Sequence, residues 1–106
     1  MLAPSPIRSG PNAQNASSIK GASVSFEEGD YLSALGQLDQ AKQYNPANPL
    51  LYYVEALILN RMGERQEAIY QLDLCILFAR EGRKKEDAGL FRAGLLTKSL
   101  LLLTGN

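Results

Sequence analysis

Few residues in this chain could perform chemistry. The sequence contains no histidine and no tryptophan, and Cys75 is its single cysteine. A nucleophilic thiol needs a neighbouring base, and a zinc site needs several cysteine or histidine ligands. These absences exclude His-based catalytic triads, Cys/His zinc sites and a disulfide framework. We therefore interpret Cys75 as a small buried thiol at a helix contact.

The charged clusters do not form a catalytic or ligand site either. The acidic groups Glu27–Glu28 and Glu86–Asp87 suit solvated helix ends, and carboxylates are favourable at a helix start. The basic group 83–85 is flanked by acids and is smaller than nucleic-acid binding by counterion release usually requires. No phosphate loop, metal-ligand spacing or dinucleotide fingerprint is present. We expect no enzymatic activity, no cofactor, no metal and no nucleic-acid partner.

The composition predicts one small domain. The chain has 106 residues, 45% of them apolar, and 11 basic residues balance 11 acidic ones. The apolar share is sufficient for a core, and the balanced charge gives no net field toward nucleic acid or an anionic membrane. Residues 1–18 lack the basic start and apolar run of a secretory signal, and the longest apolar run, 100–103, cannot span a bilayer. We expect no membrane insertion, and both cytoplasm and periplasm remain open.

Residues 1–15 differ in composition from the rest of the chain. They contain three of the five prolines and few large apolar groups. Such a segment cannot compensate the entropy lost on ordering. We predict a flexible tail over 1–15, followed by one helical domain over 16–106.

The periodicity after the tail is helical. Gly29 and Gly63 suit the left-handed position just past a helix end. Asn48 followed by Pro49 is typical of a helix cap and a first helical position. The pattern predicts an all-α chain with helices over residues 16–28, 31–44, 49–62, 65–81 and 87–103.

The sequence repeats itself at a shift of 34 residues. Small residues recur where helices must approach closely, and large apolar residues recur where space must be filled. The aligned pairs are Ala22 with Ala56, Gly29 with Gly63, Ala34 with Ala68, Leu38 with Leu72, and Ala41 with Cys75. Each unit alone leaves an apolar face that a neighbouring unit can cover.

This pattern resembles the tetratricopeptide repeat family over residues 15–82. The first unit carries the motif as Ala22, Gly29-Asp30-Tyr31, Ala34, Ala41 and Asn45-Pro46, and the second as Ala56, Gly63, Ala68 and Cys75. The second unit departs from the motif at Arg65 and Arg80, which replace a tyrosine and the exit proline. The resemblance implies a right-handed α-α superhelix, with repeats over about 15–48 and 49–82 and an extra helix over about 87–104. The alternative is a generic bundle of helical hairpins.

The third unit can be aligned in two ways. It begins near Phe91 if Gly105-Asn106 forms the next turn, whereas a second alignment places Gly94 at the small-residue position. In both alignments the partner helix of this unit is missing. We expect the chain to be part of a larger scaffold protein.

The family resemblance also implies where a partner would bind. First helices of successive repeats line a concave groove, and the positions carried over are Ile19, Phe26, Tyr53, Leu57, Asn60, Arg61 and Leu95. The family's clamp for a peptide carboxylate is absent, since its positions carry Ile19, Ser23 and Val54. We expect a protein or peptide partner with an apolar or amphipathic segment. The alternative for the apolar members is that they belong to the core.

The last predicted helix is apolar on nearly every side, so it needs burial on more than one side. We expect it to contact a second copy through Phe91, Leu95, Leu102 and Leu103. Two other functions therefore stay open. One is a structural unit that forms homo-oligomers, and the other is a small secretion-type chaperone that holds an apolar client helix.

Overall fold

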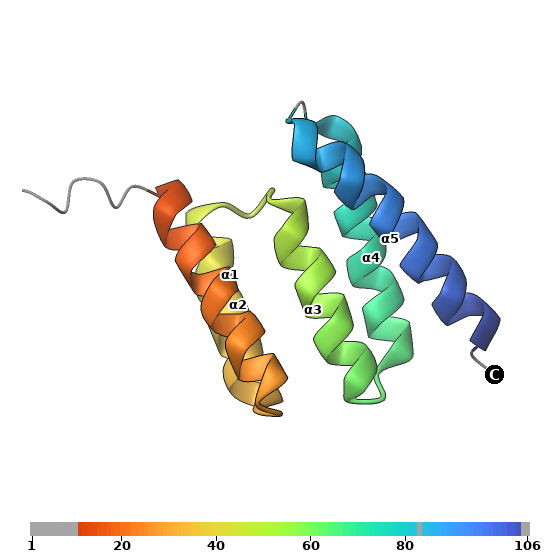
Figure 1. Ribbon diagram of the computed structural model, residues 1–106, viewed down its shortest axis with the longest axis horizontal. Coiled ribbons are helices and arrows are strands. Elements are labelled where there is room, and N and C mark those ends of the chain that lie inside the picture. Colours follow the sequence, from red (N-terminus) through yellow and green to blue (C-terminus); the bar gives the residue numbers. More distant parts are fainter. Residues whose placement is uncertain (1–10, 83, 105–106) are drawn as a thin grey trace, which may run out of the picture. The chain divides into compact units, whose positions relative to one another are not determined.

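The computed structural model describes residues 11–82 and 84–104 (Figure 1). This part of the chain is all-helical and contains no strand, which confirms the predicted fold class. The helices are α1 (Pro11–Glu27), α2 (Tyr31–Tyr44), α3 (Pro49–Arg61), α4 (Arg65–Glu81) and α5 (Lys85–Thr104). They form two compact units that divide after Pro46. The first is the α1–α2 hairpin, and the second is the α3–α4 hairpin with α5.

The first unit packs through small residues. Ala22 of α1 and Ala34 and Ala41 of α2 are completely buried, and Leu38 is the largest fully buried apolar side chain of α2. Side chains this small allow two helix backbones to approach closely. At the start of α2, the backbone N–H of Ser33 donates to Oδ1 of Asp30 at 3.3 Å. Asp30 therefore caps this helix.

The helix α1 begins earlier than the sequence predicted. We expected a flexible tail to residue 15, but α1 begins at Pro11 and Asn15 is only 2% exposed. Nδ2 of Asn15 donates to the carbonyl oxygen of Ala41 at 2.7 Å, which attaches this turn of α1 to the end of α2. The prediction was wrong for residues 11–15 because it weighed proline and apolar content, whereas the polar side chain of Asn15 makes the contact there. Residues 1–10 lie outside the described part.

The turns of the two hairpins are the same. Gly29 has φ 84° and Gly63 has φ 86°, both in the left-handed region that glycine tolerates without strain. The amide that follows each glycine donates to a carbonyl five residues back, at 2.9 Å to Ser25 O and at 2.9 Å to Leu59 O. These bonds close the helix ends by the pattern typical of glycine C-caps. The repeat of 34 residues is therefore a repeat of local structure as well as of sequence.

The second unit has a larger core. Oδ1 of Asn48 accepts from the backbone N–H of Leu50 at 3.1 Å, and Pro49 follows it in the first turn of α3. The rings of Tyr52 and Phe78 stack across the hairpin with centroids 5.3 Å apart. The buried apolar residues of α3 and α4 are Leu51, Tyr52, Val54, Ala56, Ile58, Leu59, Ala68, Leu72, Cys75 and Ala79.

The helix α5 packs on α4 through a glycine. A Cβ atom built on Gly94 would lie 3.0 Å from Cγ1 of Ile76 and 3.5 Å from Sγ of Cys75. Lys98, one turn further on, forms an ion pair with Asp73 at 2.6 Å. Of the two alignments of the third unit, the one with Gly94 at the small-residue position agrees with this contact.

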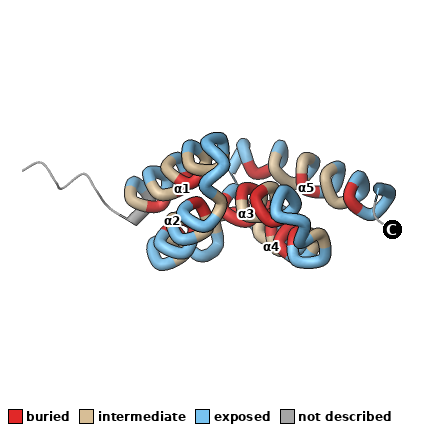
Figure 2. The backbone as a smooth tube through the Cα atoms, turned by 90° about the horizontal axis from the view of Figure 1, so that it is seen from below, coloured by how far each residue is buried: buried red, intermediate tan, exposed pale blue. Residues whose placement is uncertain are grey.

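Buried and exposed positions alternate along α5 with the helical period, so that one side of this helix is covered and the other is not (Figure 2). The covered side carries Asp87, Gly94 and Leu101. Asp87 is buried, and its Oδ2 accepts the backbone N–H of Lys84 at 3.4 Å, which satisfies an amide just before the first turn of the helix. The right-handed superhelix that the family resemblance implies stays a prediction.

Candidate functional site

The predicted groove residues of α3 share one face of that helix. Tyr53, Leu57, Asn60 and Arg61 fall within an arc of about 100°, because a helix turns about 100° per residue. Tyr53 and Leu57 are half-buried, whereas Asn60 and Arg61 are exposed. Leu50, which is 38% exposed, lies in the same arc. We call these five residues the α3 face; it is apolar at its start and polar at its end.

A hydrogen bond fixes the aromatic ring of the α3 face beside α5. The hydroxyl groups of Tyr53 and Thr97 lie 3.2 Å apart. This bond spans 44 residues of sequence and connects the first and last helices of the second unit. The tyrosine therefore presents a half-buried apolar ring whose polar end is already satisfied, an arrangement typical of aromatic anchors in interfaces.

Two predicted groove residues belong to the first unit. Ile19 is 4% exposed, and with Asn15 and Ala22 it forms the buried stripe of α1. A side chain so placed stabilises the hairpin and is not available to a partner, so Ile19 is a correction to the prediction. Phe26 is half-buried, with its ring centroid 5.8 Å from that of Tyr31.

Leu95 does not join Tyr53. Leu95 is 43% exposed, but it points about 160° away from Thr97 around α5. Thr97 is the residue of α5 that meets the α3 face. Sequence reasoning missed Thr97 because the alignment of the third unit was open, and the small residue at Gly94 was the signal that could have placed it.

The predicted oligomer contacts are split over two sides of α5. Phe91, Leu95 and Leu102 fall within about 40° of one another, whereas Leu103 lies about 100° from Leu102. Phe91 is half-buried, and Leu102 and Leu103 are 59% and 80% exposed. Leu96 and Leu100, which lie on the same side as Leu103, are 65% and 59% exposed and were not predicted.

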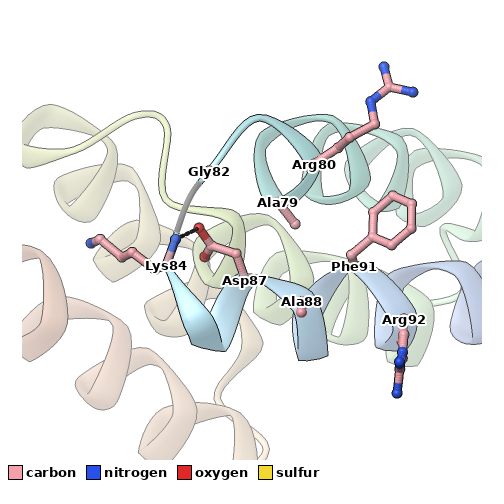
Figure 3. A pocket seen from close by; sticks show the side chains of 8 residues that line it. All are labelled: Ala79, Arg80, Gly82, Lys84, Asp87, Ala88, Phe91 and Arg92. Carbon is pink, nitrogen blue, oxygen red and sulfur yellow. Dashed lines mark hydrogen bonds between the residues drawn. The ribbon is translucent and has the colours of Figure 1, made fainter.

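A hollow of about 560 Å³ lies where α4 ends and α5 begins (Figure 3). Arg80 and Arg92 extend in different directions from Phe91, so their guanidinium groups do not converge on one point. Asp87 is turned toward the backbone N–H of Lys84. The arrangement provides neither a nucleophile nor a focused anion site. The lining residues are Ala79, Arg80, Gly82, Lys84, Asp87, Ala88, Phe91 and Arg92.

The remaining candidate for chemistry, Cys75, is buried. Its Sγ lies 3.9 Å from the carbonyl oxygen of Leu90, beneath α5. Burial raises the pKa of the thiol from 9.0 to about 11. The side chain is therefore protonated near neutral pH, and the interpretation as a buried thiol at a helix contact is confirmed.

No grouping of acidic, cysteine or histidine side chains that could hold a metal ion occurs within residues 11–82 and 84–104. In the same described ranges, no helix combines the length and apolar character that crossing a bilayer requires. Comparisons of the chain with protein-family models, with curated proteins and with solved structures found no match. The resemblance to the tetratricopeptide repeat family therefore rests on the chain's own repeated residues and turns.

Proposed function

We propose that the chain is a non-catalytic interaction module of the tetratricopeptide-repeat type, which binds an apolar or amphipathic segment of a partner protein. The observation that carries this proposal is the hydrogen bond between Tyr53 and Thr97, 3.2 Å long. It holds the α3 face beside a second helix, so the exposed part of the tyrosine ring is presented on two rigid elements. Rigid presentation lowers the entropy cost of binding.

The composition of the α3 face indicates the kind of segment. Tyr53 and Leu57 are half-buried apolar groups, one turn apart, and Asn60 follows in the next turn with its amide exposed. An amphipathic helix would place apolar side chains over the first two and a polar group against the third. Aromatic and aliphatic anchors of this kind dominate binding energy in protein interfaces.

The repeated local structure supports the family part of the proposal. Both hairpins bury alanines at the aligned positions Ala22 and Ala56, and both close with the same glycine turn. In a generic bundle of helical hairpins, buried alanines and glycine turns are not expected to recur at one fixed interval.

A capture experiment tests the proposal. The tagged full chain is used to retain proteins from a lysate of its source cells, and the retained proteins are identified by mass spectrometry. The same experiment is done with Tyr53→Glu and with Tyr70→Glu, since Tyr70 is 61% exposed on α4, away from the α3 face. Circular dichroism and thermal unfolding establish that each variant is folded.

We expect a partner that the wild type and Tyr70→Glu retain and that Tyr53→Glu loses. A peptide carrying the partner's amphipathic segment should then bind the wild type in a fluorescence-anisotropy titration. A set of retained proteins that is the same for both variants would overturn the proposal.

A further inference from the structure

We propose that two copies of the chain pair through α5, in antiparallel orientation, along a stripe formed by Gly89, Ala93, Leu96, Leu100 and Leu103. We call this stripe the α5 seam. The proposal concerns a surface separate from the α3 face and does not depend on the function proposed above.

The α5 seam has the spacing of a helix–helix contact. Its members follow one another at intervals of four, three, four and three residues, which is the spacing of the apolar positions in a coiled coil. They occupy an arc of about 80° that lies roughly 130° from Gly94 and Leu101, the residues that face α4. The α5 helix therefore has one apolar side packed on α4 and a second apolar side on which Ala93 is half-buried and the other four seam residues are exposed.

The exposure of the α5 seam is large for a single helix. Leu96, Leu100 and Leu103 are 65%, 59% and 80% exposed. None of the five seam residues is charged. Lys98 does not screen the seam either, because its ammonium is held against Asp73 on α4 at 2.6 Å. Removing leucine side chains as exposed as these from water is favourable.

The sizes of the seam residues favour a second copy as the occupant. The side chains grow along the helix, from Gly89 and Ala93 to Leu100 and Leu103. In an antiparallel pair centred on Leu96, each small residue of one copy faces a large residue of the other: Gly89 faces Leu103, and Ala93 faces Leu100. A parallel pair would instead place glycine against glycine and alanine against alanine, which would leave a gap at the start of the seam. The seam is therefore complementary to itself in one orientation.

The charges near the seam agree with the antiparallel orientation. Arg92 lies beside the seam in the first half of α5, so in an antiparallel pair centred on Leu96 it lies opposite Leu100, one turn before the end of α5 in the second copy. The carbonyl groups at a helix end lack intrahelical partners, and a cation is favourable there. In a parallel pair the two arginines would instead face each other.

The area of the α5 seam predicts a reversible dimer. With the residues that flank it, the seam would bury on the order of 500 Å² per copy, or on the order of 1,000 Å² in total. Specific interfaces begin near that total, and interfaces of this size are usually weak. We therefore expect a dissociation constant of about 10–100 μM.

The first experiment measures mass against concentration. Sedimentation equilibrium of the full chain, from about 1 μM to about 1 mM, should show the average mass rising from one chain toward two. Leu100 and Leu102 are both 59% exposed on α5, but only Leu100 belongs to the seam. We expect Leu100→Glu to weaken the dimer at least about tenfold and Leu102→Glu to leave it within about twofold. A wild type that stays monomeric, or two variants with equal effects, would overturn the proposal.

The second experiment tests the orientation and does not introduce a charge. Ala93→Leu should crowd the contact with Leu100, and Leu100→Ala should leave a gap there, so each change alone should weaken the dimer about tenfold. The double variant exchanges the small and large partners and should recover most of the affinity. Thermal unfolding shows whether each variant is folded. If the loss of dimer affinity in the double variant equals the sum of the losses in the two single variants, the antiparallel pairing is contradicted.

Discussion

Gly94 of α5 lies directly against Cys75 of α4: a Cβ atom added to the glycine would lie 3.5 Å from the cysteine Sγ. The contact joins the smallest residue of one helix to a completely buried thiol of the other. It places Leu90 O near the same thiol, at 3.9 Å. The packing of α5 on the second hairpin depends on this close approach. The positions of Thr97 and of the α5 seam therefore depend on it too.

The first prediction concerns this contact. Gly94→Val should destabilise the protein by about 1–3 kcal/mol, because its Cβ would lie 3.0 Å from Cγ1 of Ile76 and a branched side chain adds further crowding. Urea unfolding measures the change. Gly89→Ala is the control on the same helix: nothing lies within 4 Å of its Cβ position, so the alanine should stabilise α5 by about 0.5–1 kcal/mol. Equal stability of the valine variant and the wild type would show that α5 is not closely docked.

The second prediction concerns pH. The folded pKa of Cys75 is raised to about 11 from 9.0, so the unfolded chain loses its thiol proton first as the pH rises. The thiol's contribution to stability is therefore complete below about pH 9 and is lost between about pH 9 and pH 11, by an amount on the order of 2 kcal/mol. The measurement compares the wild type with Cys75→Ala, so that the difference between the two proteins reports the thiol alone.

The alanine variant matches the residue at the aligned position, Ala41, and should fold. We expect the free energy of unfolding to decrease more steeply with alkaline pH in the wild type than in this variant. A thiol reagent should also react slowly with the native protein and rapidly in urea. Identical pH slopes for the two proteins would mean that Cys75 is not desolvated in the folded state.

The third prediction concerns the start of α1. Asn15→Ala should cost about 0.5–1.5 kcal/mol, because it removes the hydrogen bond that the buried amide donates to the Ala41 carbonyl at 2.7 Å. Ser17→Ala, an exposed change two residues away, should stay within about 0.5 kcal/mol of the wild type. Chemical unfolding monitored by circular dichroism distinguishes the two. If Asn15→Ala behaves like Ser17→Ala, residues 11–15 do not belong to the folded hairpin.

The sequence predicted the parts of the fold that depend on local signals. The starts of α2 and α4 agree with the prediction because Gly29 and Gly63, in the left-handed region, end the helices that precede them. The start of α1 was missed because a polar side chain, Asn15, does the packing there, and hydrophobic periodicity does not register it.

The candidate site was predicted in part for a related reason. The positions Tyr53, Leu57 and Asn60 were implied by the family resemblance, and they share one face because of their spacing along one helix. The position of Leu95 was not predicted correctly. The direction in which it points depends on which residue of α5 contacts α4, and a contact between residues far apart in the sequence determines this. Gly94 and Cys75 make this contact.

The fourth prediction concerns the hydrogen bond that positions the α3 face. Tyr53→Phe removes one hydroxyl and Thr97→Val removes the other, and each change alone should cost about 0.5–1.5 kcal/mol because it leaves a half-buried partner unsatisfied. In the double variant both partners are apolar and of nearly the original shape, so the cost should be smaller than the sum of the two. A double-mutant cycle on urea unfolding measures this coupling. Strictly additive costs would show that the hydroxyls bond to water rather than to each other, and the α3 face would then lack the connection to α5 on which the proposed binding surface depends.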